Sequence, residues 1–186
     1  MRSVFLAFAF TISGLSAAPP ANARIDVDPA TGRITCTTAY GQYDRRPLVS
    51  LAEGGRLAGR VRLVAPAEGG RWAPAAGFLF RGASRHNAGA EIVVMPDDRE
   101  NIYVALRLPG TSAPSELGTL PNGQWVPLSV FVSEDGLLTV AIGERVFHRR
   151  VRLERPYRPV LICNSGTFEF ELAPGMRLAD PPPTDG

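Results

Sequence analysis

The feature that most constrains the fold is a succession of short segments in which apolar and polar residues alternate, separated by turn residues. Leu57, Val61 and Leu63, for example, are interspersed with arginines, and a period of two places one set on a buried face and the other in solvent. No apolar repeat of helical period runs on for long. We therefore predict an all-β chain, an antiparallel sandwich or barrel, and exclude folds that alternate strands with helices.

The alternation predicts about ten to twelve strands. Turn residues Pro29–Gly32 and Asp135–Gly136 predict two hairpins, and the Gly-, Pro- and Ser-containing segment around 109–123 predicts a loop. Trp125 begins an apolar run and is expected to pack in the core. The expected strands cover residues 25–28, 33–37, 57–63, 77–80, 91–95, 102–108, 125–132, 137–142, 146–153, 160–163 and 167–172.

The N-terminus has the pattern of a secretory signal peptide. Arg2 precedes the apolar run Val4–Ile12, which is too short to span a bilayer, and Ala21–Ala23 is a small-residue cleavage site. Cleavage after Ala18 fits the pattern as well. The C-terminal end is polar and proline-rich. The predicted organisation is a signal peptide over 1–23, a single β-sandwich domain over 24–173 and a disordered tail over 174–186.

All 20 basic residues are arginine, against 18 acidic residues. The absence of lysine excludes a P-loop lysine and Schiff-base chemistry. Richness in Arg, Ala, Gly and Pro suggests a bacterial source, and the signal peptide then predicts a periplasmic or secreted protein. Because removal of Arg2 leaves the charge nearly balanced, we expect no nucleic-acid partner. We also expect no transmembrane segment in the mature chain, and the oligomeric state stays open.

Two cysteines, Cys36 and Cys163, are present. In an oxidising compartment they most simply form a disulfide, which would close a loop of roughly 130 residues and contribute about 4–5 kcal/mol in the chain-entropy model. The alternative is a free catalytic thiol, which needs a histidine partner. Only His86 and His148 could serve.

One stretch resembles a known superfamily. The run Gly123–Leu128, followed by Glu134–Gly136 and Leu138–Gly143, is similar to the "W-x-x-L…dG…L-x-V-x-x-G" strand pair of concanavalin A-like jelly rolls, including laminin G-type domains. Gly166–Phe170 resembles their last sheet strand. The resemblance covers residues 33–172 and implies a two-sheet β-sandwich of the jelly-roll type. The superfamily includes lectins, adhesion modules and glycanases, and the fold does not choose among them.

Glu169 and Glu171 are the candidate catalytic residues. Glycoside hydrolysis needs two carboxyl groups that face one sugar bond, and residues two apart on a strand share a face at a spacing of roughly 6.5–7 Å. The superfamily's glucanase pattern E-x-D-x-x-E is absent from this sequence. The alternative is that both glutamates form a solvated face opposite arginines. His86, in a glycine-containing loop, is a further candidate for a general base.

Asp97, Asp98 and Glu100 form the densest group of oxygen ligands, of the kind that Ca²⁺ takes. The resemblance implies the same ion, because laminin G-like and lectin-like relatives often carry calcium. A plain acidic turn is the alternative, so the expected cofactor is none or Ca²⁺. Two histidines and an oxidised cysteine pair do not supply a zinc site.

The candidate ligand-binding residues are aromatic or basic. Trp72 follows a glycine-rich bend and could stack on a sugar ring, and Tyr40 and Tyr43 could join the same rim. Arginines recur at strand period in two ridges, and their guanidinium forks suit an acidic polysaccharide. The alternative is salt bridges with Glu91, Glu169 and Glu171. The ridges comprise Arg56, Arg60 and Arg62, and His148, Arg150 and Arg152.

These observations favour an exported, non-catalytic binding module that recognises a glycan or a cell-envelope protein. Two alternatives stay open. One is a small glycoside hydrolase that uses Glu169 and Glu171. The other is a structural or adhesion protein of the cell envelope.

Overall fold

The computed structural model describes residues 23–50, 56–67, 73–82, 89–97, 100–108, 111, 113–153 and 156–179. These residues form strands and no helix, so the described chain has no helix that could cross a membrane. The strands are β1 (Arg24–Val27), β2 (Ile34–Thr37), β3 (Tyr43–Ser50), β4 (Arg56–Pro66), β5 (Ala75–Arg81), β6 (Ala90–Pro96), β7 (Asn101–Arg107), β8 (Ser115–Pro121), β9 (Val126–Val132), β10 (Leu137–Ile142), β11 (Arg145–Arg150), β12 (Arg158–Asn164), β13 (Gly166–Leu172) and β14 (Met176–Leu178).

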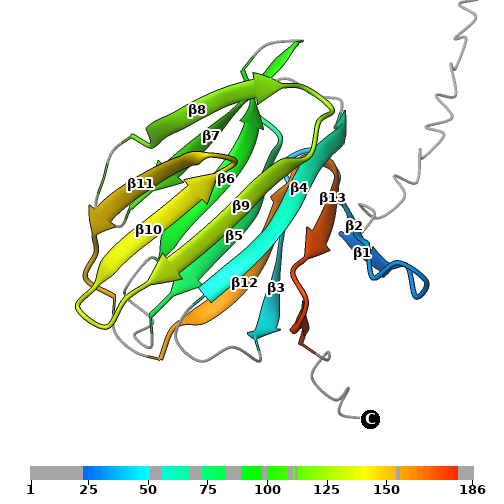
Figure 1. The fold of residues 1–186 in the computed structure, drawn as a ribbon. Helices are drawn as coiled ribbons and strands as arrows, with labels where there is room; N and C mark the ends of the chain where they lie inside the picture. The colour runs from blue at the N-terminus through cyan, green and yellow to red at the C-terminus, as the bar shows by residue number, and fades with distance from the viewer. Residues whose placement is uncertain are drawn as a thin grey trace, which may run out of the picture.

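The strands form two stacked seven-stranded sheets (Figure 1). Sheet A has the order β1-β2-β13-β4-β9-β10-β11, and sheet B has the order β14-β3-β12-β5-β6-β7-β8. All pairs of neighbouring strands are antiparallel. The predicted all-β, antiparallel two-sheet sandwich is therefore confirmed.

The core lies between the sheets, where alternate side chains of both meet. Phe78 of β5 and Phe170 of β13 are fully buried, and their ring centroids lie 6.0 Å apart at an interplanar angle of 58°. The predicted period of two in β4 is also confirmed, since Leu57 and Val61 are buried whereas Arg60 is exposed. Burial of a phenylalanine removes about 150–250 Å² of surface from water, so these rings dominate the contact between the sheets.

The predicted disulfide is present and joins the two sheets. Cys36 lies in β2 of sheet A and Cys163 in β12 of sheet B, and both residues are fully buried. Near this bridge the chain itself passes from sheet B to sheet A through a single residue, Ser165, between β12 and β13. Ser165 adopts a left-handed φ of 52°, and its hydroxyl accepts a hydrogen bond from the Gly41 amide at 3.1 Å. The disulfide thus links the two sheets covalently, close to the point where the chain crosses from β12 to β13.

Three strands, β3, β8 and β14, were not predicted. β8 occupies the segment around 109–123 that we expected to be a loop, and β14 lies inside the expected tail, so the boundary at residue 173 is wrong. β8 and β14 are the outer strands of sheet B. An outer strand has one neighbour and much solvent contact, and its sequence therefore lacks the apolar alternation of an inner strand. Residues 1–22 and 180–186 lie outside the described residues, so the signal peptide and the rest of the tail stay predictions.

Candidate functional site

The strands of the two sheets differ in composition. β9, β10 and β13 of sheet A alternate buried and less buried residues, whereas β5, β6, β7 and β12 of sheet B are apolar on both faces. Strands that are apolar on both faces are typical of sheets that are covered on both sides. Sheet B indeed carries a second buried cluster on the face turned away from sheet A, formed by Leu79, Val93, Met95, Ala105, Val160 and Ile162.

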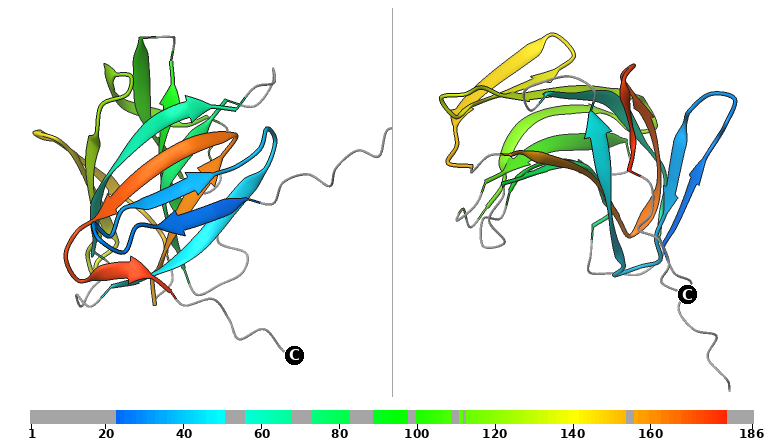
Figure 2. Two further views of the ribbon diagram at one scale, coloured as in Figure 1. Left: turned by 90° about the vertical axis from the view of Figure 1, so that its right-hand side faces the viewer. Right: turned by 90° about the horizontal axis from the view of Figure 1, so that it is seen from below.

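The outer face of sheet B is concave. The Tyr43 hydroxyl on β3 donates a hydrogen bond of 3.4 Å to Glu91 Oε1 on β6, although β12 and β5 lie between these strands. Three strand intervals span about 14 Å in a flat sheet, and curvature toward the outer side shortens that distance. Figure 2 shows this curvature in the view from below. We call this surface, with its apolar cluster and the residues around it, the concave face.

A polar network lies over the apolar cluster. Glu91 accepts the Tyr43 hydrogen bond through Oε1, and its Oε2 accepts a hydrogen bond of 3.1 Å from Arg107 Nη1. The Arg45 guanidinium lies 4.6 Å from the centroid of the Tyr43 ring. Partial burial, helped by the Glu91 carboxylate, raises the pKa of Tyr43 above its ordinary 10.0, although Arg45 acts in the opposite direction. Tyr43 therefore stays neutral at physiological pH and keeps a proton to donate.

The concave face combines an apolar floor with aromatic rings and fixed polar groups. Tyr103 packs against the apolar cluster from β7, and its hydroxyl contacts the Met95 sulfur at 3.7 Å. Surfaces of this composition hold ligands that have both an apolar face and a polar edge. Tyr43 is the one predicted site residue that the described structure places on this face.

Arg60, Arg62, Glu169 and Glu171 lie on the opposite side of the molecule, on the outer face of sheet A. Arg62 pairs with Glu169 at 2.6 Å, and Glu171 pairs with Arg60 and, at 3.0 Å, with Arg33. The Trp125 ring lies beneath all three arginines, with guanidinium carbons 4.8 to 5.6 Å from its centroid. The expectation that Trp125 packs in the core is therefore wrong, because the residue is only partly buried and its ring contacts the guanidinium groups of the surface arginines. We call this group the arginine–tryptophan cluster.

The environment of Glu171 does not suit a general acid. The pKa of Glu171 is lowered below its ordinary 4.5, mainly by a hydrogen bond from Arg60 and to a smaller extent by one from Arg33. The acid of a glycoside hydrolase needs a raised pKa so that it is protonated when the reaction begins. The geometry therefore matches the alternative weighed for these glutamates, an ion-paired surface, and we propose no hydrolase role for them.

The arginine–tryptophan cluster predicts a pH-dependent stability. Because the folded-state pKa of Glu171 is depressed, its stabilising contribution is present above the unfolded-state pKa and is lost as the pH falls through the folded-state pKa. We expect Glu171→Gln to cost about 1 kcal/mol or less at neutral pH, as exposed ion pairs do. Urea unfolding between about pH 7 and about pH 3 should show the wild-type and variant stabilities converging. Two curves that stay parallel over this range would contradict the assignment.

The remaining predicted site residues are dispersed. Arg150 lies on the edge strand β11 and is 3.7 Å from Asp135, and Arg152 is exposed just beyond that strand. Tyr40 precedes β3. Asp97 and Glu100 flank the turn between β6 and β7, and in the described ranges no group of three or more His, Cys, Asp or Glu is placed to hold a metal ion. Trp72, His86 and Asp98 lie outside the described residues, so the sugar platform, the general base and the calcium site stay predictions.

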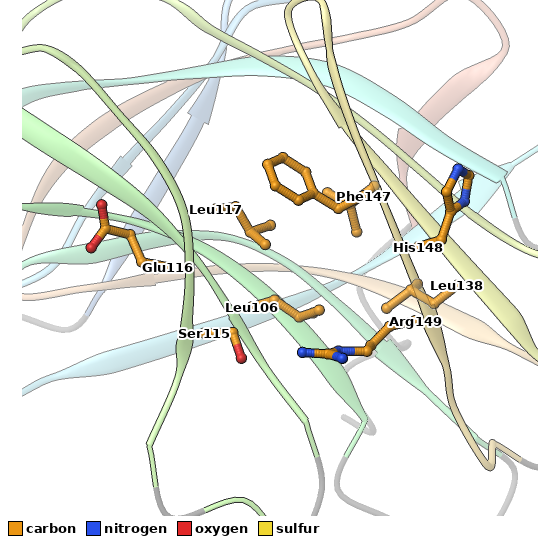
Figure 3. A pocket seen from close by; sticks show the side chains of 9 residues that line it. Leu106, Ser115, Glu116, Leu117, Leu138, Phe147, His148 and Arg149 are labelled. Atoms are coloured by element: carbon orange, nitrogen blue, oxygen red, sulfur yellow. The ribbon is translucent and has the colours of Figure 1, made fainter.

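Two cavities lie at the open edges of the sandwich. The first, of about 260 Å³, lies where the edge strands β8 and β11 diverge, and its lining includes Leu117, Phe147 and Arg149 (Figure 3). The second, of about 590 Å³, lies at the opposite edge beside β14, and Ile34, Glu171 and Met176 are among its lining residues. Neither cavity is lined by Tyr43 or Glu91, so both are separate from the concave face.

Sequence reasoning did not single out Arg45, Arg81, Arg107 and Arg158, which the structure places on the concave face, and it expected Glu91 only as a salt-bridge partner. Arg81 and Arg107 are the last residues of apolar strands, and Arg158 is the first residue of one. The available signal was that residues two apart share a face, which links Arg81 to Leu79 and Arg158 to Val160. That signal could not identify the face as an outer one, because both faces of these strands are apolar.

No family model and no curated protein match this sequence. Solved structures with a similar fold include an alginate lyase from Pseudomonas aeruginosa, at 15% identity over 81% of this chain and 74% of that one, with a TM-score of 0.50. The potassium-bound carbohydrate recognition domain of Emp46p matches at 14% identity over 85% of this chain and 86% of that one, also with a TM-score of 0.50. A carbohydrate-binding module from Bacillus subtilis matches at 10% identity over 84% and 90%, with a TM-score of 0.45. The chain has a concanavalin A-like jelly-roll fold, as the resemblance of its strand motifs implied.

Proposed function

We propose that this chain is an exported glycan-binding module whose ligand lies on the concave face of sheet B. The observation that carries the proposal is the composition of that face, an apolar floor crossed by the Tyr43–Glu91–Arg107 network. A sugar ring presents a C–H face and a hydroxyl edge. The exposed ring of Tyr43, on the same face as the apolar cluster, can pack against the first, while carboxylate, phenol and guanidinium groups bind the second.

The solved structures with a similar fold also support a saccharide as the ligand. One of the two structures at a TM-score of 0.50 is a carbohydrate recognition domain and the other is an alginate lyase, so a ligand class common to both is a saccharide. The carboxylates of Glu169 and Glu171 are already held in ion pairs by Arg60 and Arg62, which disfavours both hydrolysis and ligand binding at these two residues. The concave face, and not the arginine–tryptophan cluster, is therefore where we place the ligand.

Export rests on two observations. The Cys36–Cys163 disulfide fits an oxidising compartment, and the first 23 residues have the pattern of a signal peptide. We propose a periplasmic or secreted bacterial protein. N-terminal sequencing of the protein recovered from the periplasm of an expressing cell tests this, because an intact Met1 would contradict it.

Tyr43→Ala should weaken binding to any glycan that the wild type retains on a glycan array by at least about tenfold, as loss of a central aromatic contact does. Tyr43 is 41% exposed and so is reachable by a ligand. The matched control is Phe131→Ala, which removes an aromatic ring of 39% exposure from the outer face of sheet A. Equal binding by the wild type and Tyr43→Ala would remove the concave face from the proposal. Trp72→Ala in the same experiment tests the predicted sugar platform.

A further inference from the structure

Arg81 and Arg158 lie directly opposite each other on the neighbouring strands β5 and β12. They follow the alternation of Leu79 and Val160, so both side chains belong to the concave face. Both are exposed, and within the described residues neither has an ion-pair partner. Like charges placed directly across two strands destabilise a sheet. This pair therefore carries a cost that nothing in the described protein offsets.

The nearest carboxylate on this face does not neutralise the pair. Glu91 lies on β6, the next strand, but its Oε1 accepts from Tyr43 and its Oε2 accepts from Arg107. Glu116 lies on the distant edge strand β8 and accepts a hydrogen bond of 3.2 Å from Thr119. Glu91 and Glu116 therefore already bind other groups, and neither carboxylate compensates the positive charges of Arg81 and Arg158.

Sheet A shows what the same residue type looks like when it is neutralised. There Arg33, Arg60 and Arg62 share Glu169 and Glu171 at distances of 2.5 to 3.8 Å. The chain as a whole is close to charge balance. Glu169 and Glu171 thus neutralise the arginines on the outer face of sheet A, whereas among the described residues no carboxylate pairs with Arg81 or Arg158 on the concave face.

We propose that the ligand is a glycan that carries anionic groups, a uronate or a sulfated sugar, and that Arg81 and Arg158 hold one anionic group between them. The inference rests on the proposed function and names its ligand class. Two guanidinium forks can each form paired hydrogen bonds to a carboxylate or sulfate, and a bound anion removes their mutual repulsion. The Tyr43–Glu91–Arg107 network then contacts the uncharged hydroxyl edge beside that group.

The test is calorimetric titration of the purified protein with three probes, namely an oligogalacturonate, a sulfated dextran oligosaccharide and an uncharged malto-oligosaccharide. The wild type should bind at least one anionic probe, and Arg81→Gln with Arg158→Gln should weaken that binding by about tenfold or more. Higher salt should weaken wild-type binding more than binding by this variant. Arg81→Lys with Arg158→Lys keeps the charge but loses the fork, and should restore part of the affinity.

The matched control is Arg145→Gln with Arg149→Gln, which removes two exposed arginines that have no carboxylate partner among the described residues from β11, the edge strand of sheet A, and should leave the affinity unchanged. The melting temperature without ligand should not fall in Arg81→Gln with Arg158→Gln, because that variant relieves a repulsion. Preference between the two anionic probes identifies a uronate or a sulfate. Binding of the uncharged probe alone, unaffected by loss of Arg81 and Arg158, would overturn the inference and leave the glycan-binding proposal standing. Binding of no probe here and of no glycan on an array would overturn both.

Discussion

Replacing Cys36 and Cys163 together by alanine is expected to lower the free energy of unfolding by about 5 kcal/mol. The two residues are separated by 127 positions in the sequence, and a cross-link that closes so long a loop removes much conformational freedom from the unfolded chain. Folded domains of this size are stable by only about 5–15 kcal/mol in total. The variant should therefore be near the limit of folding at physiological temperature.

The position of the bridge adds to the expected effect. Cys36 and Cys163 are fully buried and belong to different sheets, next to the corner at which the chain crosses through Ser165. Urea unfolding followed by tryptophan fluorescence measures the loss, and the oxidised wild type compared with the wild type under a reductant provides the control for the substitutions themselves. A loss below about 1 kcal/mol in both comparisons would show that the sheets are held by packing without help from the cross-link.

Phe78→Ala is the second substitution with a large expected effect, a loss of about 3–5 kcal/mol. The ring is fully buried between the sheets and lies 6.0 Å from the ring of Phe170. Its removal takes apolar surface out of the core and leaves a cavity that the two rigid sheets cannot fill by relaxing. The same unfolding assay measures the loss.

Phe131→Ala is the matched control, since Phe131 is 39% exposed on the outer face of β9. It should change the stability by no more than about 0.5 kcal/mol. A double-mutant cycle with Phe170→Ala should show a coupling of roughly 0.5–1.5 kcal/mol between the two rings. Equal losses for Phe78→Ala and Phe131→Ala would mean that the inner faces of the sheets do not form the core described above.

The inner strands could be predicted because apolar and polar residues alternate along them, and this alternation indicates which side chains are buried. β9, β10 and β13 carry an apolar residue at every second position, and the predicted ranges agree with the observed strands. β3 and β8 could not be predicted in this way, since nearly all of their described side chains are exposed or only partly buried and their partner strands lie elsewhere in the chain. Local sequence does not record a hydrogen-bonding partner that lies far along the chain.

The candidate site shows the same division. Tyr43 was predicted as a rim residue from its type, but its partner Glu91 could not be, because two other strands separate β3 from β6 in the sheet. The arginine ridge at Arg60 and Arg62 was visible from its period of two, and the structure gave it the ion pairs that were the alternative. The pair Arg81 and Arg158 had no counterpart in the sequence argument, since neither residue belongs to a ridge.

The sequence by itself determined that this chain is a set of short antiparallel strands, that one cysteine pair is available to join its beginning to its end, and that its basic charge is arginine alone. These properties follow from period, count and residue type, which are local. The tertiary structure decided which face of sheet B is turned outward, because apolar residues on both faces of β5, β6, β7 and β12 satisfy either orientation equally well. It also decided the register that sets Arg81 opposite Arg158 and the curvature that brings Tyr43 to Glu91, because register and curvature arise only when all the strands pack together.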